Sequence, residues 1–225
     1  PRYPAAVNAR HLTGLFLSGA IYGCLAQVVP EKVIADSSSP SPRPVTTGRD
    51  RRGERFSQVL FGSGGMGAGA GRDGLNATAF PTNSGSGSIE AFESSTPVVV
   101  WRKDLLADSG GAGEWRGGLG QEVEIEVMSD EPVRLSLVSD RMKHPAGGLG
   151  GGAAGAPALA QLQDGRKPHP KGRSMLQPGD RLTMHYGGGG GYGDPAKRDP
   201  AALDRDIEDG YVTPEAAQRL YGRRG

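Results

Sequence analysis

Glycine is the residue whose placement most constrains what this chain can fold into. It occupies 38 of the 225 positions, well above the roughly 7% that is usual. No Gly-X-Y period is present, which excludes collagen. Long helical bundles are also disfavoured, because each interior glycine costs a helix roughly 1 kcal/mol relative to alanine. The glycines gather in blocks at 62–74, 110–120, 147–155 and 187–193. We predict that these blocks supply tight turns and positive φ angles in a β-rich scaffold.

Segments with β-type patterning separate the glycine blocks. Residues 121–128 alternate Val and Ile with Glu122, Glu124 and Glu126, and this period of two indicates a half-buried strand. We predict further strands at residues 56–61, 88–92, 97–103, 133–138, 158–163 and 181–186. The predicted fold class is therefore α+β, with a glycine-rich, mainly antiparallel β domain over residues 56–194 that packs as a sandwich or barrel.

Helical signals lie at the two ends of the chain. Residues 12–29 form an apolar run that is hydrophobic nearly all round, which favours a buried helix over a membrane or signal segment. We expect the segment 1–35 to belong to a larger domain. In the tail, residues 195–225, Asp199-Pro200 and Thr213-Pro214 are typical helix starts. The tail is predicted to be a helical hairpin that docks on something larger.

The segment between the first helix and the β domain, residues 36–55, is rich in Ser and Pro and predicts a loop or linker. It also holds a small basic patch, diluted by Asp50 and Glu54, whose arginines are Arg43, Arg49, Arg51, Arg52 and Arg55. Two readings stay open for this patch: a solvated loop, or a contact with an anion or a partner.

Charge and cysteine content exclude several classes of protein. Lys and Arg total 26 and Asp and Glu total 25, giving a net charge of +1. No strong global field favours nucleic acid or an anionic membrane, so we expect neither as a partner. The single cysteine, Cys24, excludes an intramolecular disulfide and a cysteine-cluster metal site. A reducing cytoplasm is the expected location.

The common catalytic and nucleotide-binding motifs are either absent from this sequence or lack the neighbouring residues they need. Residues 62–67 match G-x-G-x-x-G, but a dinucleotide site needs a helix next, and the glycines that follow cannot start one. The glycine run at 187–191 is not followed by Lys-Ser or Lys-Thr, so it is not a phosphate-binding P-loop. No G-x-S-x-G nucleophile motif occurs. The four histidines do not pair at metal-ligand spacing, so no metal site is predicted here.

His144 is the best candidate for a functional side chain, because it lies between a predicted strand and a glycine-rich loop, where residues can face a pocket. Together with His144, we name Asn83, Asp140 and Arg141 as candidate residues of a substrate pocket. A structural reading stays open, in which Asp140 and Arg141 form an ion pair and His144 caps a turn. Catalytic residues themselves are not identified.

Four groups of stretches, in order, resemble the C-terminal part of the hydantoinase B / 5-oxoprolinase family, which includes the acetone carboxylase alpha subunit. The first two are FGSGGMGAGAGRDGLNATAFPTN at 61–83 and DSGGAGEWRGGLGQ at 108–121. The others are SDR at 139–141 with PAGGLGGG at 145–152, and LQPGD at 176–180 with GGGGGYGDP at 187–195 and DIEDGYVTPEAAQRLYG at 206–222. The resemblance covers essentially the whole chain.

The resemblance implies a role in ring opening of a cyclic amide such as a hydantoin or 5-oxoproline. It implies an ATP-binding partner of the hydantoinase A type, which activates a carbonyl by phosphorylation. It places the divalent metal in the N-terminal part of the family's longer chains, so we expect this chain to bind no cofactor and to be inactive alone. Ketone carboxylation, as by an acetone carboxylase, and a non-catalytic scaffold or interaction module are the alternatives.

Overall fold

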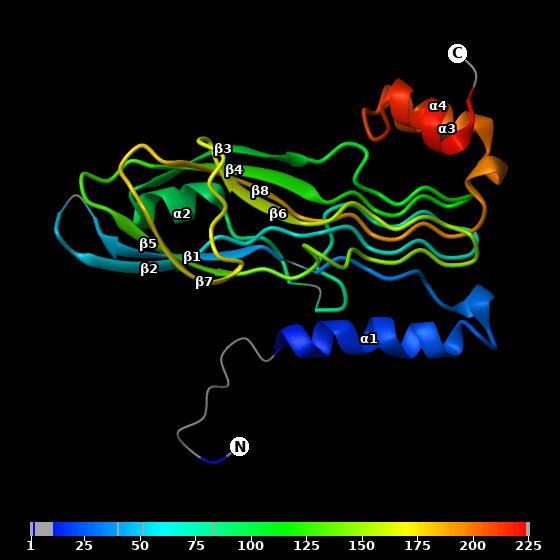
Figure 1. The fold of residues 1–225 in the computed structure, drawn as a ribbon, viewed down its shortest axis with the longest axis horizontal. Coiled ribbons are helices and arrows are strands. Elements are labelled where there is room, and N and C mark those ends of the chain that lie inside the picture. Colours follow the sequence, from blue (N-terminus) through cyan, green and yellow to red (C-terminus); the bar gives the residue numbers. More distant parts are fainter. Residues whose placement is uncertain (1, 3–10, 40, 51, 83, 224–225) are drawn as a thin grey trace.

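The computed structural model describes residues 2, 11–39, 41–50, 52–82 and 84–223. Within them, the strands form two four-stranded antiparallel sheets, in the orders β2-β1-β5-β7 and β3-β4-β8-β6. The first sheet contains β1 (Arg43–Arg49), β2 (Arg55–Val59), β5 (Val133–Val138) and β7 (Lys171–Leu176). The second contains β3 (Val98–Leu105), β4 (Gln121–Val127), β6 (Leu159–Leu162) and β8 (Arg181–His185). The two sheets lie one above the other in Figure 1, and the predicted α+β class is confirmed.

One hydrophobic core lies between the sheets, and the period-two pattern explains it. On β4, Val123, Ile125 and Val127 are almost completely buried, whereas the glutamates between them face outward. The same core cluster takes in side chains of both sheets, including Leu135 of β5 and Leu182 of β8. This alternation is what two antiparallel sheets need in order to pack face to face.

The prediction of a strand at residues 88–92 is wrong. This segment starts the helix α2 (Ile89–Ser95). Ser88 is its N-cap, and the Ser88 hydroxyl oxygen accepts a hydrogen bond from the Ala91 N–H at 3.2 Å. Phe92 turns into the sandwich core. The capping hydrogen bond and one buried aromatic ring outweigh the weak strand propensity of so short a segment.

The prediction of a loop or linker over residues 36–55 is also wrong where β1 lies. This strand is hydrogen-bonded to β2 on one side and β5 on the other. The β-branched residues Val45, Thr46 and Thr47 form its centre, and such residues favour strands. The prolines and serines before them dominate the composition of the segment and conceal this short strand.

The glycine blocks form turns in only two places, which corrects the opening prediction in part. One turn lies at residues 69–72, and the other at residues 149–152, where the Gly152 N–H donates to the Leu149 carbonyl at 3.1 Å. Elsewhere the blocks run as extended segments side by side beyond the sheets (Figure 1), and they bond to one another through the backbone. In the block 187–193, the N–H groups of Gly188 and Gly191 donate to Ala156 and Ala153, at 3.1 and 2.9 Å. Between them, the Gly190 N–H donates to Asp36, in a different segment. A neighbour that recurs every third residue indicates three residues per turn, as in a polyproline II helix, which has no internal hydrogen bonds.

Close backbone packing explains why this bundle needs glycine. A Cβ atom at Gly65 would lie 1.7 Å from the Gly118 carbonyl oxygen, and one at Gly188 would lie 1.7 Å from the Ser109 carbonyl oxygen. Within the four blocks, φ is positive only at Gly71, Gly150, Gly151 and Gly193. The glycines therefore serve mainly for close approach between segments rather than for left-handed turns. We call this assembly the glycine bundle.

The N-terminal apolar run forms α1 (His11–Leu25), which lies along the glycine bundle (Figure 1). Among the described residues it is not buried all round, because Leu17, Ile21 and Leu25 are 60%, 47% and 44% exposed. Leu15 alone of its described side chains is buried. The expectation that this helix belongs to a larger domain stays a prediction. No helix in the described part of the chain is long and apolar enough to cross a membrane.

The tail forms the predicted helical hairpin, α3 (Pro200–Glu208) and α4 (Pro214–Tyr221), with Asp199 and Thr213 as N-caps. The buried Arg198 attaches the hairpin to the glycine bundle. Its Nη2 atom lies 2.8 Å from Asp73 Oδ2 in the bundle and 2.6 Å from Asp206 Oδ2 in α3. Two short 3-10 helices, η1 (Pro30–Lys32) and η2 (Pro195–Lys197), complete the described elements.

Candidate functional site

A pocket of about 330 Å³ lies at one end of the β5–β7 pair, where the first sheet meets the glycine bundle. It contains three of the four candidate residues from the sequence, Asp140, Arg141 and His144. The fourth, Asn83, lies outside the described residues. The remaining lining residues are Ser139, Met142, Lys143, His169, Pro170 and Lys171. The β5–β7 register explains the pocket, because Val138 pairs with Lys171 and the Ser139 N–H donates to the Pro170 carbonyl at 2.7 Å. The residues that follow β5 therefore lie beside those that precede β7.

Asp140 is fixed by contacts with two neighbouring segments. Its Oδ1 atom lies 2.8 Å from Lys171 Nζ, and its backbone N–H donates to the Ser41 hydroxyl at 2.7 Å. The Ser41 hydroxyl in turn donates to the Val138 carbonyl. The alternative reading of an ion pair between Asp140 and Arg141 is wrong, because each of these groups has a different partner. The pocket therefore carries a Lys–carboxylate pair on one wall.

Arg141 is a positioning residue rather than a free ligand-binding group. Its φ of +58° is left-handed, and its Nη1 and Nη2 atoms lie 2.7 and 2.8 Å from the two Asp36 carboxylate oxygens. Nη2 also donates to the Ser37 carbonyl, and the guanidinium stacks 4.7 Å from the ring centre of Phe16 in α1. These contacts join the pocket wall, the glycine bundle and α1 through one side chain.

His144 is a pocket group that is free to meet a ligand. It is exposed, and its side chain forms no hydrogen bond with the described part of the chain. An imidazole is the side chain best suited to exchange protons near neutral pH. The reading in which His144 caps a turn has no contact to support it among the described residues.

Sequence reasoning missed the pocket residues that come from the segment opposite Asp140, including His169 and Lys171. His169 is exposed and lines the pocket, where its Nδ1 accepts the Lys171 N–H at 3.2 Å. Lys171 begins β7, a strand that the sequence did not predict. Recognition of β7 as the partner of β5 would have placed both residues opposite Asp140.

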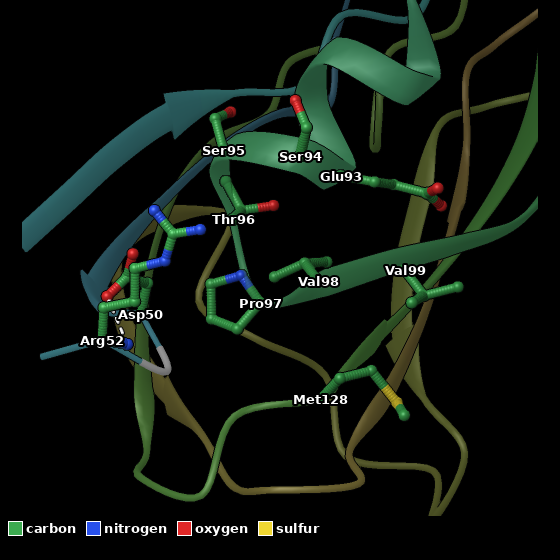
Figure 2. A pocket seen from close by; sticks show the side chains of 10 residues that line it. All are labelled: Asp50, Arg52, Glu93, Ser94, Ser95, Thr96, Pro97, Val98, Val99 and Met128. Carbon is green, nitrogen blue, oxygen red and sulfur yellow. Dashed lines mark hydrogen bonds between the residues drawn. The ribbon is translucent and has the colours of Figure 1, made fainter. Parts of the chain in front are cut away.

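A second hollow, of about 360 Å³, lies between the end of α2 and the β1–β2 turn (Figure 2). Its acidic groups are already engaged by the protein itself. Asp50 Oδ1 accepts the N–H groups of Arg52 and Glu54, each at 2.9 Å, and Glu93 accepts the Val100 N–H at 2.7 Å. Since these groups stabilise local backbone, this hollow is a weaker candidate than the pocket around Asp140.

The residues described here do not fit a metal ion. Across the described ranges, no three side chains of His, Cys, Asp or Glu come close enough together to hold one. The acidic groups of the candidate pocket and its surroundings, Asp140 and Asp36, are each paired with a cation of the chain.

A family model described as Hydantoinase B/oxoprolinase matches residues 1–195. The chain therefore belongs to the hydantoinase B/oxoprolinase family, as the order of its motifs predicted.

Curated relatives agree with this membership. The chain is 35% identical to the beta subunit of the caprolactamase of Pseudomonas jessenii over 92% of its own length. It is 28% identical to the B-type subunit of a putative D-/L-hydantoinase of a Pseudomonas species over 99% of its length. In each case it spans only 38% of the relative.

A solved structure extends the likeness to three dimensions. The crystal structure of the ATP-dependent caprolactamase of P. jessenii is 30% identical to this chain and superposes with a TM-score of 0.78. The superposition covers 88% of this chain and 36% of that one. The fold described above therefore corresponds to one part of a larger relative.

Proposed function

We propose that this chain is the C-terminal part of the B-type subunit of an ATP-dependent hydrolase that opens cyclic amides. The observation that carries the proposal is the 35% identity to a caprolactamase beta subunit over 92% of this chain. A lactam, a hydantoin and 5-oxoproline share a ring amide. Ring opening adds water across that amide, breaks the C–N bond, and leaves a carboxylate and an amine.

In this proposal ATP is consumed on a partner of the hydantoinase A type, and any divalent metal is held outside the residues described here. The motivation is that the acidic groups of this pocket already have cationic partners in the chain. The complex is proposed to work in the cytoplasm, and this chain by itself is proposed to be inactive.

The pocket at the junction is proposed to face the substrate. His144 would contact the reacting amide or its leaving nitrogen, as a hydrogen-bond or proton-transfer group. The Lys171 ammonium, which Asp140 holds at 2.8 Å, would donate one of its remaining N–H groups to a substrate carboxylate or carbonyl oxygen. Arg141, tied to Asp36 on both nitrogens, would keep that wall in place.

The test is an activity assay with the full-length protein and its second subunit. Caprolactam, hydantoin, 5-oxoproline and acetone with bicarbonate are each supplied with and without ATP, and product and ADP are quantified. The proposal predicts that at least one cyclic amide is opened only when ATP and both subunits are present. Hydrolysis by this chain alone without ATP would contradict it, as would carboxylation of acetone with no amide opened.

A further inference from the structure

The outer faces of the two sheets differ sharply in charge. The four strands of the first sheet contain no Asp or Glu. Alternation places four exposed arginines on its outer face, which we call the arginine face: Arg49, Arg55, Arg134 and Arg173. The second sheet carries the glutamates of β4 on its outer face. A chain with a net charge of only +1 thus has one strongly basic side.

The register brings the arginines close together. Arg49 of β1 lies directly opposite Arg55 of β2, and Thr47, two residues along β1, lies opposite Arg134 of β5. Like charges directly opposite each other on neighbouring strands destabilise a sheet. A depression of about 660 Å³ opens over these residues, and Met175 of β7 lines it as well.

On the outer face of the second sheet, by contrast, the charged side chains form ion pairs with one another. There, Glu122 pairs with Arg102 at 2.6 Å, and Arg181 lies 3.3 Å from Glu124 and 2.9 Å from Glu126. Each glutamate thus has a cation from a neighbouring strand. On the arginine face, none of the four guanidiniums has a carboxylate partner within the described ranges, and Arg49 donates only to the Gly53 carbonyl.

Acidic residues near the arginine face do not neutralise it. Asp50, in the β1–β2 turn, accepts two backbone N–H groups of that turn. Glu54, Asp130 and Glu131 lie in loops at the same end of the sheet, and none forms an ion pair with the face in the part of the chain described. Asp50, Asp130 and Glu131 line one hollow with Arg49 and lower the positive potential there. The guanidinium groups of the arginine face, which form no ion pair within the described ranges, can still bind an external anion.

The composition of the face favours a protein as the source of that anion. Arginine and methionine are enriched in protein interfaces, and lysine is depleted. The face combines four arginines with Met175, which is 48% exposed, and its one lysine, Lys171, is engaged with Asp140. A second copy of this chain fits poorly, because the glutamates of its other sheet already have cationic partners.

We propose that the arginine face binds a carboxylate-rich surface of the second subunit. This inference rests on the proposed function only in requiring that a second subunit exists. Charge complementarity of this kind raises the association rate and makes binding sensitive to salt.

The test measures the affinity of the full-length protein for the second subunit at low and high salt. The reversal variant combines Arg49→Glu, Arg55→Glu and Arg134→Glu. We expect it to weaken binding by at least about tenfold at low salt, whereas three Arg→Lys changes at the same positions retain most of the affinity. The control variant makes the same change in net charge elsewhere, with Lys167→Glu, Arg205→Glu and Arg219→Glu, and is expected to bind as the wild type does.

Several results would overturn the inference. Equal affinities of the wild type and the reversal variant would do so, as would equal losses in the reversal and control variants. Binding of a single-stranded RNA oligonucleotide that is lost in the reversal variant, with subunit affinity unchanged, would assign the face to nucleic acid instead. If the two-subunit assay opens a cyclic amide while the reversal variant binds normally, only this inference fails. If the wild-type subunits neither associate nor act together, the proposed function fails with it.

Discussion

A substitution of Gly65 by alanine tests the glycine bundle most severely. The new Cβ would lie 1.7 Å from the Gly118 carbonyl oxygen and 2.7 Å from the Gly189 nitrogen, so the segments must separate. Gly65 is held by hydrogen bonds to Gly187 and Ser38, at 3.0 and 2.9 Å. Losing both costs about 2 kcal/mol, and overpacking adds about 1–3 kcal/mol. We therefore expect a destabilisation of about 3–5 kcal/mol, or about 6–20 °C in the unfolding midpoint.

The matched control lies in the same bundle. Gly147 belongs to the bundle, because its carbonyl accepts the Asp36 N–H at 3.0 Å. A Cβ at this position would nevertheless meet no atom within 4 Å. Gly147→Ala should change stability by no more than about 1 kcal/mol. Thermal unfolding of the full-length variants, followed by circular dichroism and calorimetry, compares the two. Equal midpoints for Gly65→Ala and Gly147→Ala would refute the close-packing explanation.

Three further predictions concern buried polar groups. Tyr186 is fully buried, burial raises the pKa of its phenol, and its hydroxyl has no hydrogen-bond partner among the described residues. Tyr186→Phe should therefore be neutral or stabilising in urea unfolding, and a loss above about 2 kcal/mol would reveal a hidden partner. Arg198→Ala removes the cation that Asp73 and Asp206 share, while Arg116 Nε stays 3.3 Å from Asp206, so we expect a loss of about 3 kcal/mol, the lower end for a broken buried pair, and early proteolysis of the tail. An unchanged free energy of unfolding in Arg198→Ala would show that other contacts hold the hairpin on the glycine bundle. Partial burial raises the pKa of Asp73, but hydrogen bonds and charge from Arg198 and Arg116 lower it more, so the net pKa is below its ordinary value. The stability from Asp73 is therefore complete above its unfolded pKa of about 3.9 and is lost as the pH falls through the folded pKa. Unfolding midpoints of Asp73→Asn should accordingly depend less on pH in the acid range than those of the wild type, and parallel profiles would count against this assignment.

Local signals in the sequence predicted the elements whose stability is local. The alternation at residues 121–128 identified β4, because each inward side chain enters one core. The Asp-Pro and Thr-Pro pairs identified both tail helices, because Asp199 and Thr213 cap them through hydrogen bonds within one turn. These interactions involve neighbours in sequence and can be read from it.

The glycine bundle could not be predicted in this way. Its hydrogen bonds join segments far apart in the chain, such as Gly189 to Gly118 and Gly190 to Asp36. A glycine with a distant backbone neighbour looks, in sequence, like a glycine in a turn. β7 was missed because only Leu176 among its residues is fully buried, so its pattern is weak.

The candidate site was predicted in part. Asp140, Arg141 and His144 do line one pocket, because they follow β5 directly. The partners that define their roles come from remote segments: Lys171 from β7 and Asp36 from the glycine bundle. Those pairings depend on the fold, and the residues next to Asp140 and Arg141 in the sequence do not indicate them.

The most direct test of the proposed function is the effect of His144→Ala on catalysis by the complete two-subunit enzyme. His185→Ala serves as the control, since His185 lies on β8 beside Glu122, away from the pocket. The value of kcat/KM for the best cyclic amide is measured with unfolding midpoints alongside. We expect His144→Ala to lower kcat/KM by about 100-fold or more with an unchanged midpoint, and His185→Ala to retain full activity. Unchanged kinetics in His144→Ala would contradict the assignment of this pocket to the substrate.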